Sequence, residues 1–229
     1  MGTHFERKLE ELHAQMTAIG NLCEQAITLS AEAVRGGGDQ VVRQVFETDR
    51  DIDAKEREIE GQCMKLLLLQ QPVAGDLRRI SAALRMVADM ERIGDQAADI
   101  ADLALHMDTA AVKVSADIAG IADATVHMVQ GSIEAFVDMD LKKSRYVINS
   151  DDIVDNAFNE IKENLADQIY GKKLDARTGL DILMTAKYFE RIGDHAVNIA
   201  EWVEFAITGE HRNNEHEYDF EKEMAAFIK

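Results

Sequence analysis

Apolar residues recur every three or four positions along most of the chain, the spacing of one face of an α-helix. The periodicity lapses in a few places, where glycines, the single proline or a short polar run indicate a turn. Six long helices are therefore expected, over residues 4–35, 39–70, 75–106, 115–137, 140–170 and 175–208. The fold class predicted from this pattern is all-α.

The six predicted helices are three helices used twice. The pentapeptide Glu91–Asp95 recurs letter for letter as Glu190–Asp194, and the same offset aligns Ile100 with Ile199. Such a repeat indicates two tandem, internally duplicated three-helix bundles. The expected units are 1–109 and 110–209, followed by a polar C-terminal extension over 210–229.

Composition narrows the class of protein further. With 43 acidic and 25 basic residues, the net charge is −18, so no basic surplus exists to neutralise the phosphates of a nucleic acid. The longest aliphatic run, Leu66–Leu69, is too short to span a membrane, and the charged start of the chain does not resemble a signal peptide. Two cysteines, Cys23 and Cys63, cannot form a disulfide framework and are expected to be buried. A cytoplasmic protein is predicted.

Carboxylates occur in pairs four residues apart, which places both members on one helix face. Glu91 and Asp95 form one pair, which Asp99 extends by a turn, and Asp49 and Asp53 form another on the preceding helix. Because the proline turn between these helices is short, they should be antiparallel neighbours. Each pair lies about 19 residues from that proline, so the two pairs should reach the same height.

The second half repeats the arrangement, with Asp151 and Asp155 on one helix and Glu190, Asp194 and Asn198 on the next. Like charges facing one another are unfavourable, and a bound cation removes that cost. Sites made only of oxygen ligands suit Mg²⁺, Mn²⁺ or Ca²⁺, carboxylate-bridged iron is also open, and zinc is less favoured. One metal site per half is predicted.

A glycine lies inside each motif, at Gly94 and Gly193, where it costs about 1 kcal/mol relative to alanine. Close approach by a neighbouring helix or by metal ligands explains a glycine there. The competing interpretation is a solvated acidic face, neutralised locally by arginines such as Arg50. His195 points about 100° away from Asp194, so we expect it beside the ligands or at the surface.

At these residues the chain resembles the PhoU family of bacterial phosphate-signalling regulators. The resemblance covers about residues 4–208 and rests on His4-Phe5, Gln70–Arg78, Glu91–Ala97 and Glu190–Glu201. It implies tandem three-helix bundles whose repeated motifs bind multinuclear metal clusters, often of iron. Matched residue by residue, the implied ligands are Asp49, Asp53, Glu91, Asp95 and Asp99 for one cluster, and Asp151, Asp155, Glu190, Asp194 and Asn198 for the other.

The resemblance also implies a regulator rather than an enzyme. Such a protein restrains the phosphate-starvation response and phosphate uptake by linking the ATPase subunit of the phosphate ABC transporter to a sensor histidine kinase. A homodimer is expected. The alternative is a carboxylate-bridged metalloenzyme, an oxidase or hydrolase, but ferritin-like sites need two Glu-x-x-His elements and only Glu10–His13 fits.

Overall fold

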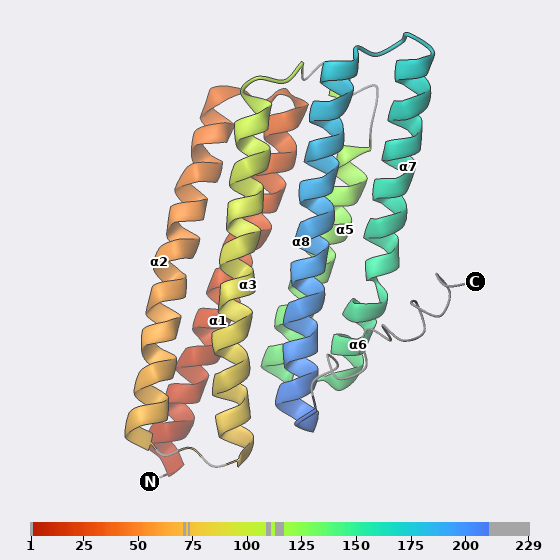
Figure 1. Cartoon of the computed structure of the whole chain (residues 1–229). Helices are drawn as coiled ribbons and strands as arrows, with labels where there is room; N and C mark the ends of the chain where they lie inside the picture. Colours follow the sequence, from red (N-terminus) through yellow and green to blue (C-terminus); the bar gives the residue numbers. More distant parts are fainter. Residues whose placement is uncertain (1, 71, 73, 109–110, 113–116, 211–229) are drawn as a thin grey trace, which may run out of the picture.

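Two helical units lie side by side in the computed structural model of the chain, which describes residues 2–70, 72, 74–108, 111–112 and 117–210 (Figure 1). The first unit contains α1 (Gly2–Glu32), α2 (Gly38–Gln70) and α3 (Ala74–Ala104). The second contains α5 (Ile118–Asp138), α6 (Leu141–Asn149), α7 (Asp151–Tyr170) and α8 (Ala176–Thr208). The described residues include no strand. The predicted all-α fold of two duplicated helical bundles is confirmed.

The joints between helices follow from residues with special backbone or capping properties. Between α1 and α2, a π-helical segment (Ala33–Gly37) contains Gly36 with φ 98°, and Gly38 has φ 77°, which favours glycine. Asp140 and Asp175 each accept two backbone N–H groups in the first turns of α6 and α8. Gly209, with φ 85°, ends α8. These signals lie where the sequence places its joints.

One helix expected over 140–170 is two helices in the structure. At Ser150 the backbone N–H donates to the carbonyl of Val147, one residue short of the α-helical partner, and the hydroxyl donates to the carbonyl of Tyr146 at 2.8 Å. A serine that bonds backward in this way competes with the helical ladder and bends the helix. The break places Asp151 in the first turn of α7.

Helices α1, α3, α5 and α8 form the centre of the molecule, because α3 packs on α8 and α1 packs on α5. α2 covers one side, against α1 and α3, and α6 and α7 cover the other, against α8 (Figure 1). Met90 and Ile93 of α3 and Phe189 and Ile192 of α8 are fully buried in one core that draws on both units. Burying each such side chain contributes about 1.5–3 kcal/mol. The expected unit boundaries stay a prediction, and the extension from residue 211 onward lies outside the described residues.

Both cysteines are buried, as expected. Cys23 and Cys63 have no exposed surface, and Cys23 Sγ lies 3.5 Å from the carbonyl oxygen of Met90. Burial raises the pKa of each thiol to about 12, so neither is a thiolate at neutral pH. They pack as small apolar groups.

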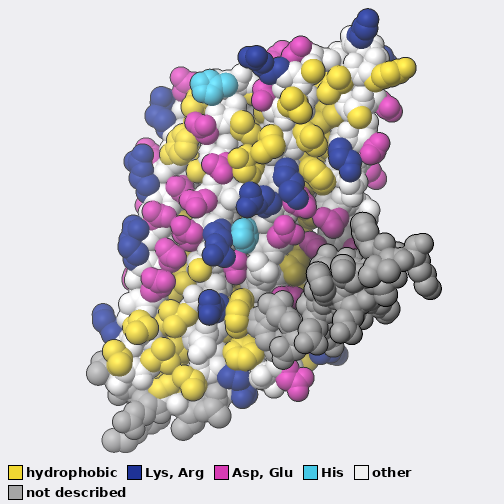
Figure 2. Space-filling model, in the orientation of Figure 1, with side chains coloured by type: hydrophobic (Ala, Val, Ile, Leu, Met, Phe, Trp, Pro, Cys, Tyr) yellow, Lys and Arg dark blue, Asp and Glu magenta, His cyan; other side chains and the backbone are white. Residues whose placement is uncertain are grey.

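The surface carries charges of both signs, with acidic side chains over the middle of the face drawn in Figure 2 and hydrophobic groups nearer its two ends. Leu180 and Met184 of α8 are among the large hydrophobic residues that stay exposed. Of the helices that the structure describes, none is long and apolar enough to cross a membrane.

Candidate metal centre

Gly94 allows α2 to approach α3 closely. A Cβ atom at this position would lie 2.9 Å from Asp49 Oδ1 and 3.1 Å from Ile52 Cδ1. The glycine in the middle of the motif is therefore explained by a neighbouring helix and by the side chain of a predicted ligand. Asp49 itself faces α3.

The five residues predicted for the first site influence one another across α2 and α3. Burial raises the pKa of Asp49 to about 6, with Asp95, Asp53 and Asp99 adding to the effect and Arg50 opposing it. Asp49 Oδ1 is buried and accepts no hydrogen bond. Desolvation, then Asp95 and Asp53, raise the pKa of Glu91 as well. We call these residues the first cluster: Asp49, Asp53, Glu91, Asp95 and Asp99.

The second half repeats this electrostatic pattern. Burial raises the pKa of Asp151 to about 6, and Asp155, Asp194 and Glu190 add to the effect in that order. At the glycine of this motif, a Cβ atom would lie 3.2 Å from Val154 Cγ1, so the contact is looser and purely apolar. We call these residues the second cluster: Asp151, Asp155, Glu190, Asp194 and Asn198.

A sixth carboxylate belongs beside the first cluster and was missed from the sequence. Desolvation, then Glu91, Glu60 and Asp53, raise the pKa of Glu56. The signal was present, since Glu56 and Glu60 continue the face of Asp53 at helical spacing. At the equivalent position, the second half carries Phe158.

Contacts between α3 and α8 tie each cluster to the opposite unit. The amide of Asn198 donates to Asp89 Oδ1 at 3.3 Å, so only its carbonyl oxygen is free to bind a metal. In the equivalent contact, the hydroxyl of Tyr188 bonds to Asp99. His195 Nδ1 also lies 2.9 Å from Asp89 Oδ1. His195 is thus turned toward α3, and its place beside the ligands stays a prediction.

The donor set fits a hard cation. Among the residues that the structure describes, no three His, Cys, Asp or Glu side chains already converge closely enough to hold a metal ion. The side chains around Asp49 and Asp151 nevertheless raise one another's pKa, and Asp49 Oδ1 lacks a partner. A cation between them would replace repulsion with attraction and satisfy the buried oxygen. The ligand assignment stays a prediction that this chemistry supports.

Comparison with known proteins shows similarity over most of the chain, in both helical units. The family model of the PhoU domain matches twice, over residues 16–104 and 118–203. The "phosphate-specific transport system accessory protein PhoU homolog" of Clostridium acetobutylicum is 32% identical over 207 residues, which cover 90% of this chain and 94% of that protein. The Synechocystis protein of the same name is 32% identical over 208 residues, covering 90% of this chain and 92% of its own.

Solved structures show the same arrangement of helices. The crystal structure of PhoU from Pseudomonas aeruginosa matches with a TM-score of 0.80 at 29% identity, covering 90% of this chain and 100% of that one. PhoU from Streptococcus pneumoniae matches with a TM-score of 0.82 at 22% identity over 90% of this chain and 98% of its own, which supports the fold. On the two matched domains and these relatives, the chain belongs to the PhoU family.

Proposed function

We propose that this protein regulates phosphate homeostasis by restraining the phosphate-starvation response and phosphate uptake. The observation that carries the proposal is similarity over 90% of the chain to relatives that are named accessory proteins of the phosphate-specific transport system. The protein would act in the cytoplasm as an adaptor, between the ATPase subunit of the phosphate ABC transporter and a sensor histidine kinase. We propose that it does so as a homodimer and without catalysing a reaction.

Metal binding is the second part of the proposal. The first and second clusters would each hold a multinuclear metal cluster, for which oxygen ligands favour iron, manganese or magnesium over zinc. Bound cations would supply positive charge between α2 and α3 and between α7 and α8. The support is the raised pKa of Asp49 and of Asp151, which burial causes first and neighbouring carboxylates increase.

A deletion strain tests the regulatory role. We expect phosphate-scavenging genes to stay expressed in phosphate-rich medium when the protein is absent, measured with a transcriptional reporter. A plasmid copy should restore repression, and an exposed control variant, Asp138→Asn, should restore it equally well. Normal repression in the deletion strain would overturn the proposal.

Metal content tests the second part separately. The purified protein and the Asp95→Asn, Asp194→Asn double variant would be compared by elemental analysis after loading with Mn²⁺ or, without oxygen, with Fe²⁺. We expect the double variant to retain much less metal, and equal content would remove the site assignment. Turnover of a redox or ester substrate that depends on Asp95 and Asp194 would favour the metalloenzyme alternative.

A further inference from the structure

The two clusters differ in their nearest fixed charges although they occupy equivalent positions. Glu56 beside the first cluster corresponds to Phe158 beside the second, and Asp99 corresponds to Asn198. At these two positions the first site has two more carboxylates than the second, while at a third position Arg50 beside Asp49 corresponds to Asp152 beside Asp151. The second site adds a cation of its own, because Lys187 stands where the first half has an alanine.

Two contacts hold Lys187 at the edge of the second site, where its own side chain is 43% exposed. Its Nζ lies 2.5 Å from Glu190 Oε2, and the Glu190 side chain is only 13% exposed. The same ammonium lies 5.4 Å from the centre of the Phe158 ring, within the range of a cation–π interaction. Burial and then Glu190 raise the pKa of Asp194, and the charge of Lys187 offsets part of that rise. One lysine thus acts on two predicted metal ligands.

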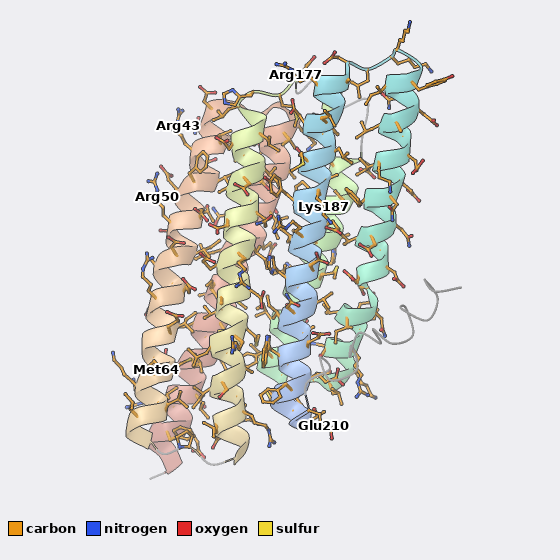
Figure 3. The ribbon with its side chains drawn as sticks, viewed as in Figure 1. Arg43, Arg50, Met64, Arg177, Lys187 and Glu210 are labelled. Atoms are coloured by element: carbon orange, nitrogen blue, oxygen red, sulfur yellow. The ribbon has the colours of Figure 1, made fainter. Side chains whose placement is uncertain are left out.

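The basic residues of the first site are placed differently. Arg57 Nη1 lies 3.6 Å from Asp53 Oδ2, but its side chain is 65% exposed, so solvent screens the pair. Arg50 is also exposed, and Figure 3 shows it at the outer edge of α2, whereas Lys187 lies on α8. Arg92 and Arg191, whose charges also reach this cluster, are exposed too, so among the described residues the first cluster has no half-buried cation equivalent to Lys187.

We propose that Lys187 is a built-in counter-cation that makes the second cluster the weaker metal site, so that the two halves bind metal in sequence. The first cluster fills first because its negative charge has only screened partners. The second fills at higher metal concentration, because the incoming cation must displace the lysine ammonium from Glu190. This inference rests on the metal binding proposed above and adds an order of filling.

Titration of the full-length, chelator-treated protein with Mn²⁺ tests the order, with calorimetry for affinity and the electron paramagnetic resonance signal of free Mn²⁺ for stoichiometry. We expect two classes of sites in the wild type. Asp95→Asn should remove the tighter class and Asp194→Asn the weaker one. Lys187→Met keeps the aliphatic stem, and Lys162→Met is the matched control, since Lys162 on α7 bonds only to the exposed Asn159 in the contacts described.

Lys187→Met should increase the Mn²⁺ affinity of the weaker class of sites by about tenfold. An opposite charge within about 4–6 Å changes the proton affinity of a carboxylate by at least about this factor, and we expect a similar effect on a bound cation. Lys162→Met should change neither class. The reciprocal variant, Ala88→Lys, should lower the Mn²⁺ affinity of the tighter class of sites by a similar factor, which keeps the test independent of how Lys187→Met folds.

Equal titrations of Lys187→Met and Lys162→Met would overturn the role of Lys187 while leaving the metal sites intact. A wild type that binds no Mn²⁺ would overturn this inference together with the proposed metal sites, but not the regulatory role.

Discussion

His195 on α8 and Asp89 on α3 are joined by a contact of 2.9 Å between Nδ1 and Oδ1, and the Asp89 side chain is only 7% exposed. Asn198 donates to the same oxygen at 3.3 Å, and Arg92 lies 3.5 Å from it. One buried carboxylate is thus contacted by three nitrogen donors at the interface between the two halves of the chain.

Replacing that carboxylate should weaken the interface. Asp89→Ala leaves two partly buried donors without an acceptor, which should cost about 2 kcal/mol of unfolding free energy and lower the Tm by about 4–8 °C. Thermal unfolding followed by circular dichroism measures the change. The control is Asp138→Ala, whose ion pair with Lys143 at 2.8 Å is exposed and should contribute little. Equal losses in the two variants would contradict the importance of the buried contact.

The glycines of the two motifs should respond differently to alanine. Gly94→Ala pushes against Asp49 Oδ1 at 2.9 Å, so we expect weaker Mn²⁺ binding by the first cluster. Gly193→Ala meets Val154 at 3.2 Å, and a small shift of that side chain should preserve binding by the second cluster. Gly61 has open space around it, so Gly61→Ala should stabilise the protein by about 1 kcal/mol without affecting metal binding. Calorimetric titration and thermal unfolding of the three variants check these expectations, and equal metal affinity in all three would refute them.

The raised pKa of Asp49 predicts an unusual dependence of stability on pH in the metal-free protein. Its pKa in the folded state is about 6 against an ordinary value of 3.8, so the folded state holds the proton more tightly. The contribution of this group to stability is present below about pH 4 and is lost as the pH rises through 6. Asp49→Asn should therefore raise the Tm of metal-free protein at pH 7, on the order of 2 °C, and leave it unchanged at pH 4.

Thermal unfolding of chelator-treated protein across that pH range measures the difference between the variant and the wild type. Asp51→Asn, an exposed neighbour on α2, is the matched control and should show no such trend. If the Tm difference between Asp49→Asn and the wild type did not depend on pH, the raised pKa of Asp49 would be contradicted.

The turn between α7 and α8 contains a residue in an unfavourable backbone conformation. Lys172 is exposed and has φ 56°, a region that costs an L-residue roughly 1–2 kcal/mol relative to glycine. Lys172→Gly should raise the Tm by about 2–4 °C, as differential scanning calorimetry would show. Lys173, its exposed neighbour, lacks a positive φ, so Lys173→Gly should give no gain. A gain of equal size in both variants would point to removal of charge instead.

The periodicity and the repeat predict the helices and the duplication because both can be read directly from the order of residues along the chain. The faces of Asp49 and Gly94 were also predictable, since helical spacing and a short turn determine them. The break at Ser150 was not, because the apolar pattern runs through it and only a side-chain hydrogen bond marks it. The position of Glu56 beside the first cluster could have been predicted from its helical spacing to Asp53. The contact of Asp89 with His195 depends on how two distant helices pack, which no local pattern records.

The packing of α3 on α8 also bears on how such a chain can arise. Position 89 of the first repeat faces position 198 of the second, and position 188 faces position 99. Two separate, identical copies of the first repeat would place aspartate against aspartate at both contacts. Within one chain the copies are free to diverge, so that each contact pairs an aspartate with a hydrogen-bond donor, Asn198 in one case and Tyr188 in the other. Gene fusion thus permits an asymmetric interface that a dimer of single repeats cannot encode.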